Sequence, residues 1–228
     1  MRKMVAAILA ACGLAIAPGA VGPAHAMPAD CPPICDRIPN SAWIDPTQIP
    51  LYPTYRWPGL AGVAVTTTNP RFRFEEACAS PPVPDDPRGY AVSARATVPQ
   101  PDGQWQLQVQ VMHWRGETWR GGQLATSVFD AAVASLRNCP LTTPQYSALV
   151  TTGEPTRAAA VISGPQVVHQ YLIVDPQNST VSELALWMAP GPGQAPQAPL
   201  VPWPMVPDAQ VFDAMAAPLC GAYVGSCG

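Results

Sequence analysis

Positive charge is scarce in this sequence, and lysine is almost absent. The 228 residues include 12 lysines and arginines against 15 aspartates and glutamates, and Lys3 is the single lysine. Proteins that bind nucleic acid or lie on anionic bilayers use clustered cations to meet the phosphate groups. The composition therefore argues against a nucleic-acid partner and against adhesion to an anionic membrane surface.

Motifs for cofactor, metal and nucleotide chemistry are also lacking. The sequence contains no HExxH, P-loop, GxGxxG or calcium-binding loop, and after residue 26 only His113 and His169 could offer imidazole ligands, so neither a cofactor nor a metal is expected. There is no GxSxG, and Ser226 lies in a short tail beside a cysteine. We predict that the protein is not an enzyme. A secreted hydrolase that uses His169 as its base is the alternative.

Long apolar runs are lacking except near the N-terminus, where the pattern predicts a secretory signal. Two basic residues precede an apolar run, and residues 24–26 have the Ala-His-Ala form that signal peptidase recognises. We predict a signal peptide over residues 1–26, cleaved after Ala26, and a secreted protein of the cell envelope without a transmembrane span. The alternative is lipid modification at Cys12. Cleavage would leave 10 arginines against 15 acids, a net charge of −5.

Cysteine occurs in an even number after the predicted signal. The six residues are Cys31, Cys35, Cys78, Cys139, Cys220 and Cys227. An even count in an exported chain predicts three disulfides, because that environment is oxidising. Two prolines between Cys31 and Cys35 hold the backbone extended, so these two are not expected to pair. We predict a bridge between Cys78 and Cys139, with the two N-terminal cysteines bonded to the two C-terminal ones.

Proline, in contrast, is abundant, with 30 residues in the chain. It fixes φ and removes a backbone donor, so dense stretches predict irregular structure. The predicted organisation is a signal peptide over 1–26, a proline-rich irregular segment over 27–87, an α+β core over 88–188, a proline-rich linker over 189–207, and a C-terminal helix with a cysteine tail over 208–228.

The core shows the periodicities of strands and helices. Strands are predicted over residues 89–98, 104–114, 157–162, 167–174 and 180–188, with a possible earlier strand over 62–68. Asp102-Gly103 suits the turn of the first hairpin. Helical spacing predicts one helix from Leu124 to Leu136, and Asp208 begins a second, short one that ends at Pro218. The order β-β-α-β-β-β-α predicts an α+β fold, disulfide-bonded, whose twisted antiparallel sheet carries both helices on one face.

This element order resembles a known family. The strand ending in "QVMHW", the helix ending in cysteine ("SVFDAAVASLRNC"), the paired strands of "QYLIVDPQNSTVSELALWM" and the final short helix are similar to the extracytoplasmic sensor-like domain of mycobacterial serine/threonine kinases of the PknH type and its stand-alone exported or lipoprotein relatives. The resemblance covers about residues 88–220. It implies a twisted antiparallel sheet with helices on one side, disulfides, and a ligand cleft on the other side. The chain departs from that family in lacking a kinase domain and in its proline-rich ends.

The strand "QWQLQVQVMHW" over residues 104–114 alternates strictly. Counting in twos puts one set of side chains on an apolar face, namely Trp105, Leu107, Val109, Val111 and His113. The other face carries four glutamines, Met112 and Trp114. We expect the helices to cover the apolar face, which makes His113 a structural residue, and we expect the glutamine face to be open.

Tryptophan and arginine follow this strand closely, a composition that is typical of binding hot spots, although such aromatics also close cores. The predicted ligand-binding residues are Gln106, Gln108, Gln110, Met112, Trp114, Trp119 and Arg120. The predicted function is an exported, non-enzymatic, sensor-like module that binds a small ligand or a cell-envelope protein on the open sheet face. The alternative is a structural or interaction protein that acts through its proline-rich segments.

Overall fold

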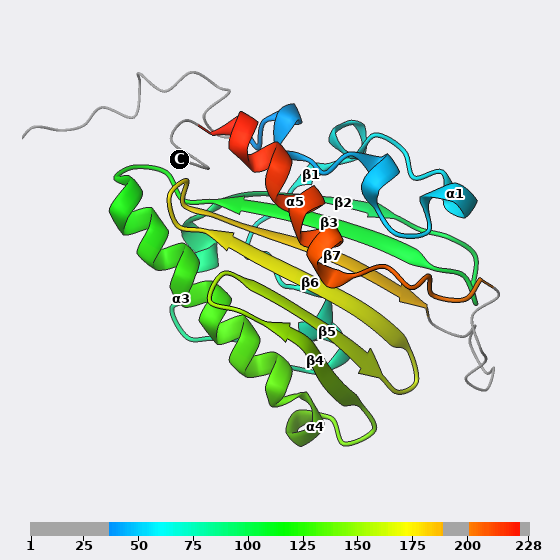
Figure 1. Cartoon of the computed structure of the whole chain (residues 1–228). Helices are drawn as coiled ribbons and strands as arrows, with labels where there is room; N and C mark the ends of the chain where they lie inside the picture. The colour runs from blue at the N-terminus through cyan, green and yellow to red at the C-terminus, as the bar shows by residue number, and fades with distance from the viewer. Residues whose placement is uncertain (1–36, 189–200, 224–228) are drawn as a thin grey trace, which may run out of the picture. The chain divides into compact units, whose positions relative to one another are not determined.

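The computed structural model describes residues 37–188 and 201–223, which fall within one compact unit. Figure 1 shows a central sheet with helices packed on it. In chain order, with η for 3-10 helices, the elements are η3 (Asn40–Ala42), η4 (Pro46–Gln48), α1 (Tyr52–Tyr55), η5 (Leu60–Gly62), β1 (Val65–Thr66), α2 (Arg73–Ala77), η6 (Pro87–Tyr90), β2 (Val92–Val98), β3 (Gln106–His113), α3 (Thr118–Arg137), α4 (Cys139–Thr142), β4 (Ser147–Gly153), β5 (Arg157–Ser163), β6 (Val167–Asp175), β7 (Thr180–Met188) and α5 (Asp208–Ala222). The predicted signal peptide, Cys12, Cys31, Cys35, Cys227 and most of the predicted linker lie outside the described residues.

The sheet has seven strands in the order β1-β2-β3-β7-β6-β5-β4. Every neighbouring pair is antiparallel. The predicted α+β fold with an antiparallel sheet is therefore confirmed. The C-terminal strand β7 lies in the middle, between β3 and β6, so that residues far apart in the chain become neighbours, such as Gln110 and Glu183.

The hairpin of β2 and β3 follows the prediction from its turn residues. Its register runs from Val92 opposite His113 to Val98 opposite Leu107. Gly103 in the connection adopts φ 76°, a left-handed conformation that glycine adopts without a steric penalty. Because side chains alternate along a strand, this register puts the apolar and glutamine sets of β3 on opposite faces, as expected.

The two long helices lie on opposite faces of the sheet, so the expectation that they share one face is wrong (Figure 1). α5 buries Val211, Phe212, Met215 and Leu219 against the face that contains Leu107, Val109, Tyr171, Leu184 and Leu186. α3 packs on the reverse face, against Leu172, Val174 and Val181. The reason is that β6 and β7 are apolar on both faces, and an antiparallel strand of that kind needs cover on each side.

The α3 face is fixed by a disulfide and by residues that precede the core. Cys78 and Cys139 are bonded, with their Cα atoms 5.0 Å apart, which confirms that predicted pair. Phe72 and Phe74, on either side of the start of α2, are buried in the same apolar cluster as α3. The bridge therefore joins the end of α2 to the start of α4 and holds α2 against this face. The pairing of the four terminal cysteines stays a prediction.

Two glycines let α3 begin very close to the turn between β6 and β7. A Cβ atom on Gly121 would lie 2.4 Å from the hydroxyl oxygen of Ser179, and one on Gly122 would lie 2.4 Å from the carbonyl oxygen of Pro176. Glycine within a helix costs about 1 kcal/mol relative to alanine. The close approach explains why glycine stands at both positions.

Several elements differ from the prediction, among them β4 and α5. β4 was not among the predicted strands. It lies at the edge of the sheet, four of its seven residues are exposed, and its register shifts between Val150 and Thr152. α5 was expected to stop at Pro218, yet it continues to Ala222. Proline removes a helical hydrogen bond, but Leu219, the next residue, is fully buried on the sheet and offsets part of that loss.

Candidate functional site

The glutamine face of β3 is covered, so the expectation of an open sheet face is wrong. Gln110 and Met112 are fully buried, and Gln108 and Trp114 are exposed by only 4% and 3%. The cover is α3 together with the stretch from Arg71 to Ala77. This stretch precedes the predicted core in the sequence but packs on this face of the sheet. A ligand does not reach these side chains in the structure described.

Beneath this cover lies a buried polar cluster that spans four strands. We call it the Glu183 cluster, and it consists of Arg95, Gln108, Gln110, Gln170 and Glu183. The register aligns Arg95 of β2, Gln110 of β3 and Glu183 of β7 in one row. Gln108 and Gln170 lie one row further along the same face, on either side of Ala185.

Glu183 is the centre of the cluster and is fully buried. Its carboxylate accepts hydrogen bonds from the backbone N–H of Arg73 at 2.6 Å and from the amides of Gln108 and Gln170 at 3.0 Å each. Burial raises the pKa of Glu183 to about 7, although these hydrogen bonds and the charge of Arg95 act in the opposite direction. The carboxyl group therefore titrates near neutral pH while it holds α2 on the sheet.

We expect Glu183→Gln to remove a pH dependence of stability. Folding raises the pKa of Glu183 from 4.5 to about 7, so the protonated form favours the folded state. The stability that Glu183 contributes is fully present below pH 4.5 and is lost as the pH rises through about 7. At about 1.4 kcal/mol per pKa unit, the loss is roughly 3 kcal/mol. Urea unfolding of the wild type between about pH 5 and about pH 8 should show this decline, and the glutamine variant should not.

Glu154→Gln is the matched control, because Glu154 lies in the exposed turn after β4. It removes one carboxylate without touching the cluster, so the decline should persist. If Glu183→Gln kept the same pH profile as the wild type, the assignment of the titration to Glu183 would be wrong.

The other predicted site residues do not come together. Gln106 binds back to Gln100 through hydrogen bonds of 2.7 and 2.6 Å and closes the β2–β3 hairpin. Trp114 lies in the α3 core and donates its indole N–H to the carbonyl of Pro87 at 2.9 Å. Trp119 is 63% exposed in the first turn of α3, beside the exposed Arg120. The seven residues therefore divide between a buried cluster, a core, the end of the β2–β3 hairpin and a separate surface.

A groove of about 550 Å³ lies along α3 on the same side of the sheet. We call it the α3 groove. Its lining is mostly apolar or neutral and consists of Phe72, Glu75, Pro81, Val83, Asp86, Pro87, Arg88, Ser127, Val128, Ala131, Ala132, Ala134, Ser135, Asn138 and Thr142. Small side chains of α3 form one wall and the proline-rich loop 81–87 forms the other. The Cys78–Cys139 bridge links the chain shortly before this loop to the chain just after α3.

Three charged side chains in this lining form a buried group, the Arg88 triad of Glu75, Asp86 and Arg88. Arg88 donates to Glu75 at 2.5 and 3.1 Å and to Asp86 at 2.6, 2.8 and 3.0 Å. Burial alone would lower the pKa of the Arg88 guanidinium, but hydrogen bonds and charge attraction from Asp86 and Glu75 outweigh it and raise that pKa. Arg88 also lies 5.2 Å from the ring of Phe72. The triad thus joins the loop to α2, and its guanidinium stays charged.

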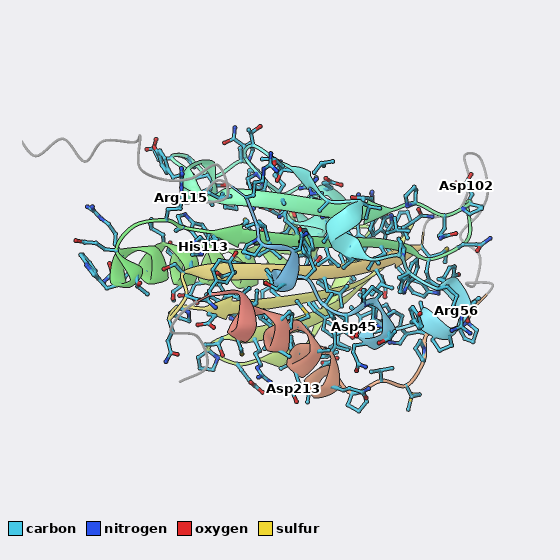
Figure 2. The ribbon with its side chains drawn as sticks, turned by 90° about the horizontal axis from the view of Figure 1, so that it is seen from above. Asp45, Arg56, Asp102, His113, Arg115 and Asp213 are labelled. Atoms are coloured by element: carbon cyan, nitrogen blue, oxygen red, sulfur yellow. A yellow bond between two sulfur atoms is a disulfide. The ribbon has the colours of Figure 1, made fainter. Side chains whose placement is uncertain are left out.

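A larger hollow, about 740 Å³, lies on the α5 side between α5 and the segment of η3 and η4. Its charged residues are Asp45 and Asp213, both labelled in Figure 2 and both exposed. Exposed charges are screened by water and contribute little to discrimination between ligands. The α3 groove is the better candidate, because its polar groups are fixed and mostly desolvated.

The two histidines lie apart, and each stacks on a different aromatic ring. The half-buried His113 stacks on Tyr223 with ring centres 4.4 Å apart, and burial lowers its pKa; it lies at the end of β3 beside Arg115 (Figure 2). His169 stacks on Trp203 at 3.6 Å, and burial lowers its pKa to about 4. His169 lines a hollow of about 220 Å³, and among the described residues around it there is no serine or cysteine. Thr151 lines the same hollow, but its hydroxyl donates to the carboxylate of Asp208 at 2.7 Å.

Sequence reasoning missed the groove and three of the five residues of the Glu183 cluster, namely Arg95, Gln170 and Glu183. A signal for the cluster was present, because Glu183 and Gln170 are long polar residues in strands that are mostly apolar, "TVSELALWM" and "VVHQYLIV". A polar residue within a buried strand needs a partner on the same face. The groove has no such local signal, since its walls come from two separate parts of the chain.

Within residues 37–188 and 201–223, no three His, Cys, Asp or Glu side chains gather as a metal site. In the same described part, no helix has the length and apolar character that a bilayer span requires. Compared with known proteins, the chain matches no family model and no curated protein sequence.

Proposed function

We propose that the chain is an exported, non-enzymatic binding module of the bacterial cell envelope that takes a small, mainly apolar ligand in the α3 groove. The observation that carries this proposal is the groove itself, about 550 Å³ with apolar walls and a fixed, buried charged group in its lining. Small-molecule sites have this character: concave, mainly apolar, preformed, and provided with a few placed polar groups. The ligand site thus moves from the sheet face to the space beside α3.

The rigidity of the groove supports a binding role. The disulfide joins α2 to α4, Ser135 donates to Ser80 at 2.9 Å, and Thr142 and Thr143 each donate to the carbonyl of Cys78 at 2.7 Å. These contacts hold the α3 wall to the chain that leads into the opposite loop. A preformed site loses less entropy when a ligand binds, which favours affinity.

Export and the absence of catalysis remain parts of the proposal. The Ala-His-Ala signal pattern and the disulfide both suit an oxidising compartment. The similarity in element order to PknH-type sensor-like domains also favours a ligand-binding role. An interaction protein that works through the proline-rich segment 189–207 is the alternative, and it would leave the α3 groove without a function.

The groove is tested with N-phenyl-1-naphthylamine, an uncharged apolar probe whose fluorescence rises when it leaves water. The full secreted protein should bind it, and Ala131→Trp should weaken binding by about tenfold or more, because each tenfold step needs only about 1.4 kcal/mol. Ala131 lines the groove and is exposed, so the larger side chain fills the groove without entering the core.

Gln123→Trp is the control, because Gln123 is exposed on the same helix but does not line the α3 groove. Both variants should unfold at the wild-type temperature. Equal loss of probe binding in both variants, or no effect of Ala131→Trp, would contradict the proposal. Loss of binding on deletion of residues 189–200, with Ala131→Trp unaffected, would favour the interaction protein.

A further inference from the structure

We propose that the ligand of the α3 groove carries a positive charge on an apolar body, as in an alkylammonium compound, and that Asp86 recognises this charge. This inference rests on the proposed function of the groove. It adds the chemical class of the ligand, which neither the fold nor the groove volume defines.

The charges of the Arg88 triad do not cancel. Two carboxylates, Glu75 and Asp86, share one guanidinium, so the triad carries a net charge of −1. The other lining residues of the groove are uncharged. A cation that enters therefore meets a group with excess negative charge in surroundings of lower dielectric than water, where the attraction is stronger.

The guanidinium of Arg88 makes its hydrogen bonds within the triad and does not bind the ligand. The Nε, Nη1 and Nη2 atoms of Arg88 all donate to Glu75 or Asp86. The side chain of Arg88 is 6% exposed, whereas that of Asp86 is 27% exposed. The carboxylate of Asp86 is therefore the charged group that an incoming ligand reaches first.

The neighbouring cations Arg71 and Arg73 are engaged by other partners. Arg71 donates to the carbonyl of Ser80 at 2.5 Å, and Arg73 pairs with Glu76 and lies over the ring of Trp187 at 4.4 Å. Neither arginine belongs to the lining. An anionic ligand would meet Asp86 without a compensating cation, so the geometry disfavours fatty acids and phosphate esters.

The apolar remainder of the lining suits an alkyl or aryl body. Val83, Val128, Ala131 and Ala132 offer methyl groups, and the backbone of loop 81–87 is restricted by its prolines. Burial of each methylene of a ligand contributes about 0.8 kcal/mol. The apolar body of the ligand contributes the affinity, and Asp86 makes the site select a cationic ligand.

The experiment compares three competitors with the same alkyl chain, namely octyltrimethylammonium, 1-octanol and octyl sulfate, for displacement of N-phenyl-1-naphthylamine below their micellar concentrations. In the wild type, octyltrimethylammonium should displace the probe at a concentration about tenfold lower than 1-octanol, and octyl sulfate should be weakest. The advantage should shrink as salt is raised, because the interaction is electrostatic.

Asp86→Asn should collapse the ratio between the cationic and neutral competitors, and Asp86→Glu, which restores the charge, should recover it. A ratio is used because it is independent of any change in probe affinity. Equal displacement by the cationic and neutral compounds in the wild type, or a ratio that persists in Asp86→Asn, would overturn the inference while the groove remained a binding site. Failure of the probe itself to bind would instead contradict the proposed function.

Discussion

Replacing Cys78 or Cys139 by alanine should lower the free energy of unfolding by about 4 kcal/mol, the loss expected when a cross-link that closes a loop of this size is removed. The bridge spans 61 residues, so the unfolded chain gains much freedom when it is absent. Both cysteines are fully buried, which adds a packing loss. Urea unfolding at equilibrium, monitored by tryptophan fluorescence, measures the change.

The double variant provides the control. If the covalent link is the cause, Cys78→Ala, Cys139→Ala and the double variant should all lose nearly the same stability, because the link breaks only once. Two small losses that add in the double variant would instead indicate packing alone. The α3 groove would then owe its shape to α3 and the loop rather than to the bridge.

Replacing Arg88 by methionine should lower the free energy of unfolding by about 3–5 kcal/mol, as expected when one partner of a buried ion pair is removed. Methionine keeps most of the side-chain volume but leaves Glu75 and Asp86 without their cation. Glu75 has a side chain that is only 6% exposed, so water does not replace the lost partner. Thermal and urea unfolding both report the loss.

Arg157→Met is the matched control, because Arg157 forms a comparable pair with Asp213 at 3.0 Å with side chains that are 33% and 72% exposed. Its loss should cost less than about 1 kcal/mol. Glu75→Gln combined with Arg88→Met should recover part of the loss by removing the stranded charge. Equal effects of the two arginine variants would show that burial of the triad does not matter.

The sequence predicted those parts of the fold that depend on local signals. The turn at Gly103 predicted the β2–β3 hairpin, and the alternation of β3 predicted which side chains share a face. The positions of β5, β6 and β7 were predicted within a residue or so, since each is an apolar run between turn residues. The face on which each helix packs was not predictable in this way, because β6 and β7 are apolar on both faces and accept a helix on either side.

The candidate site was predicted less well, and for a related reason. Alternation identified Gln108 and Gln110 as members of one face, but their exposure depends on Arg71 to Ala77, which are separated from them by more than thirty positions in the sequence. The choice of Trp114 failed because an aromatic at a strand end serves a core as readily as a ligand. The α3 groove forms between α3, α2 and the loop, which are separated in the sequence.

The Glu183 cluster and the α3 groove lie on the same side of the sheet and share a short stretch of chain. The backbone of Arg73 binds Glu183, and Phe72 and Glu75, which line the groove, lie within two residues of it. The same short stretch of chain therefore contacts a carboxyl group that titrates near pH 7 and forms part of the groove. Measurements of ligand binding should accordingly be made at a fixed pH, with Glu183→Gln as a comparison.

The claim that the α3 groove is the ligand site is tested most directly by mapping where a small probe binds. Amide chemical shifts of the isotope-labelled full chain, followed during titration with octyltrimethylammonium, locate the contact without a mutation. The account predicts that the largest changes fall on Val83, Asp86, Ser127, Ala131 and Ser135. Changes concentrated instead on Trp43, Gln48, Gln210 and Asp213, which line the hollow beside α5, would contradict it.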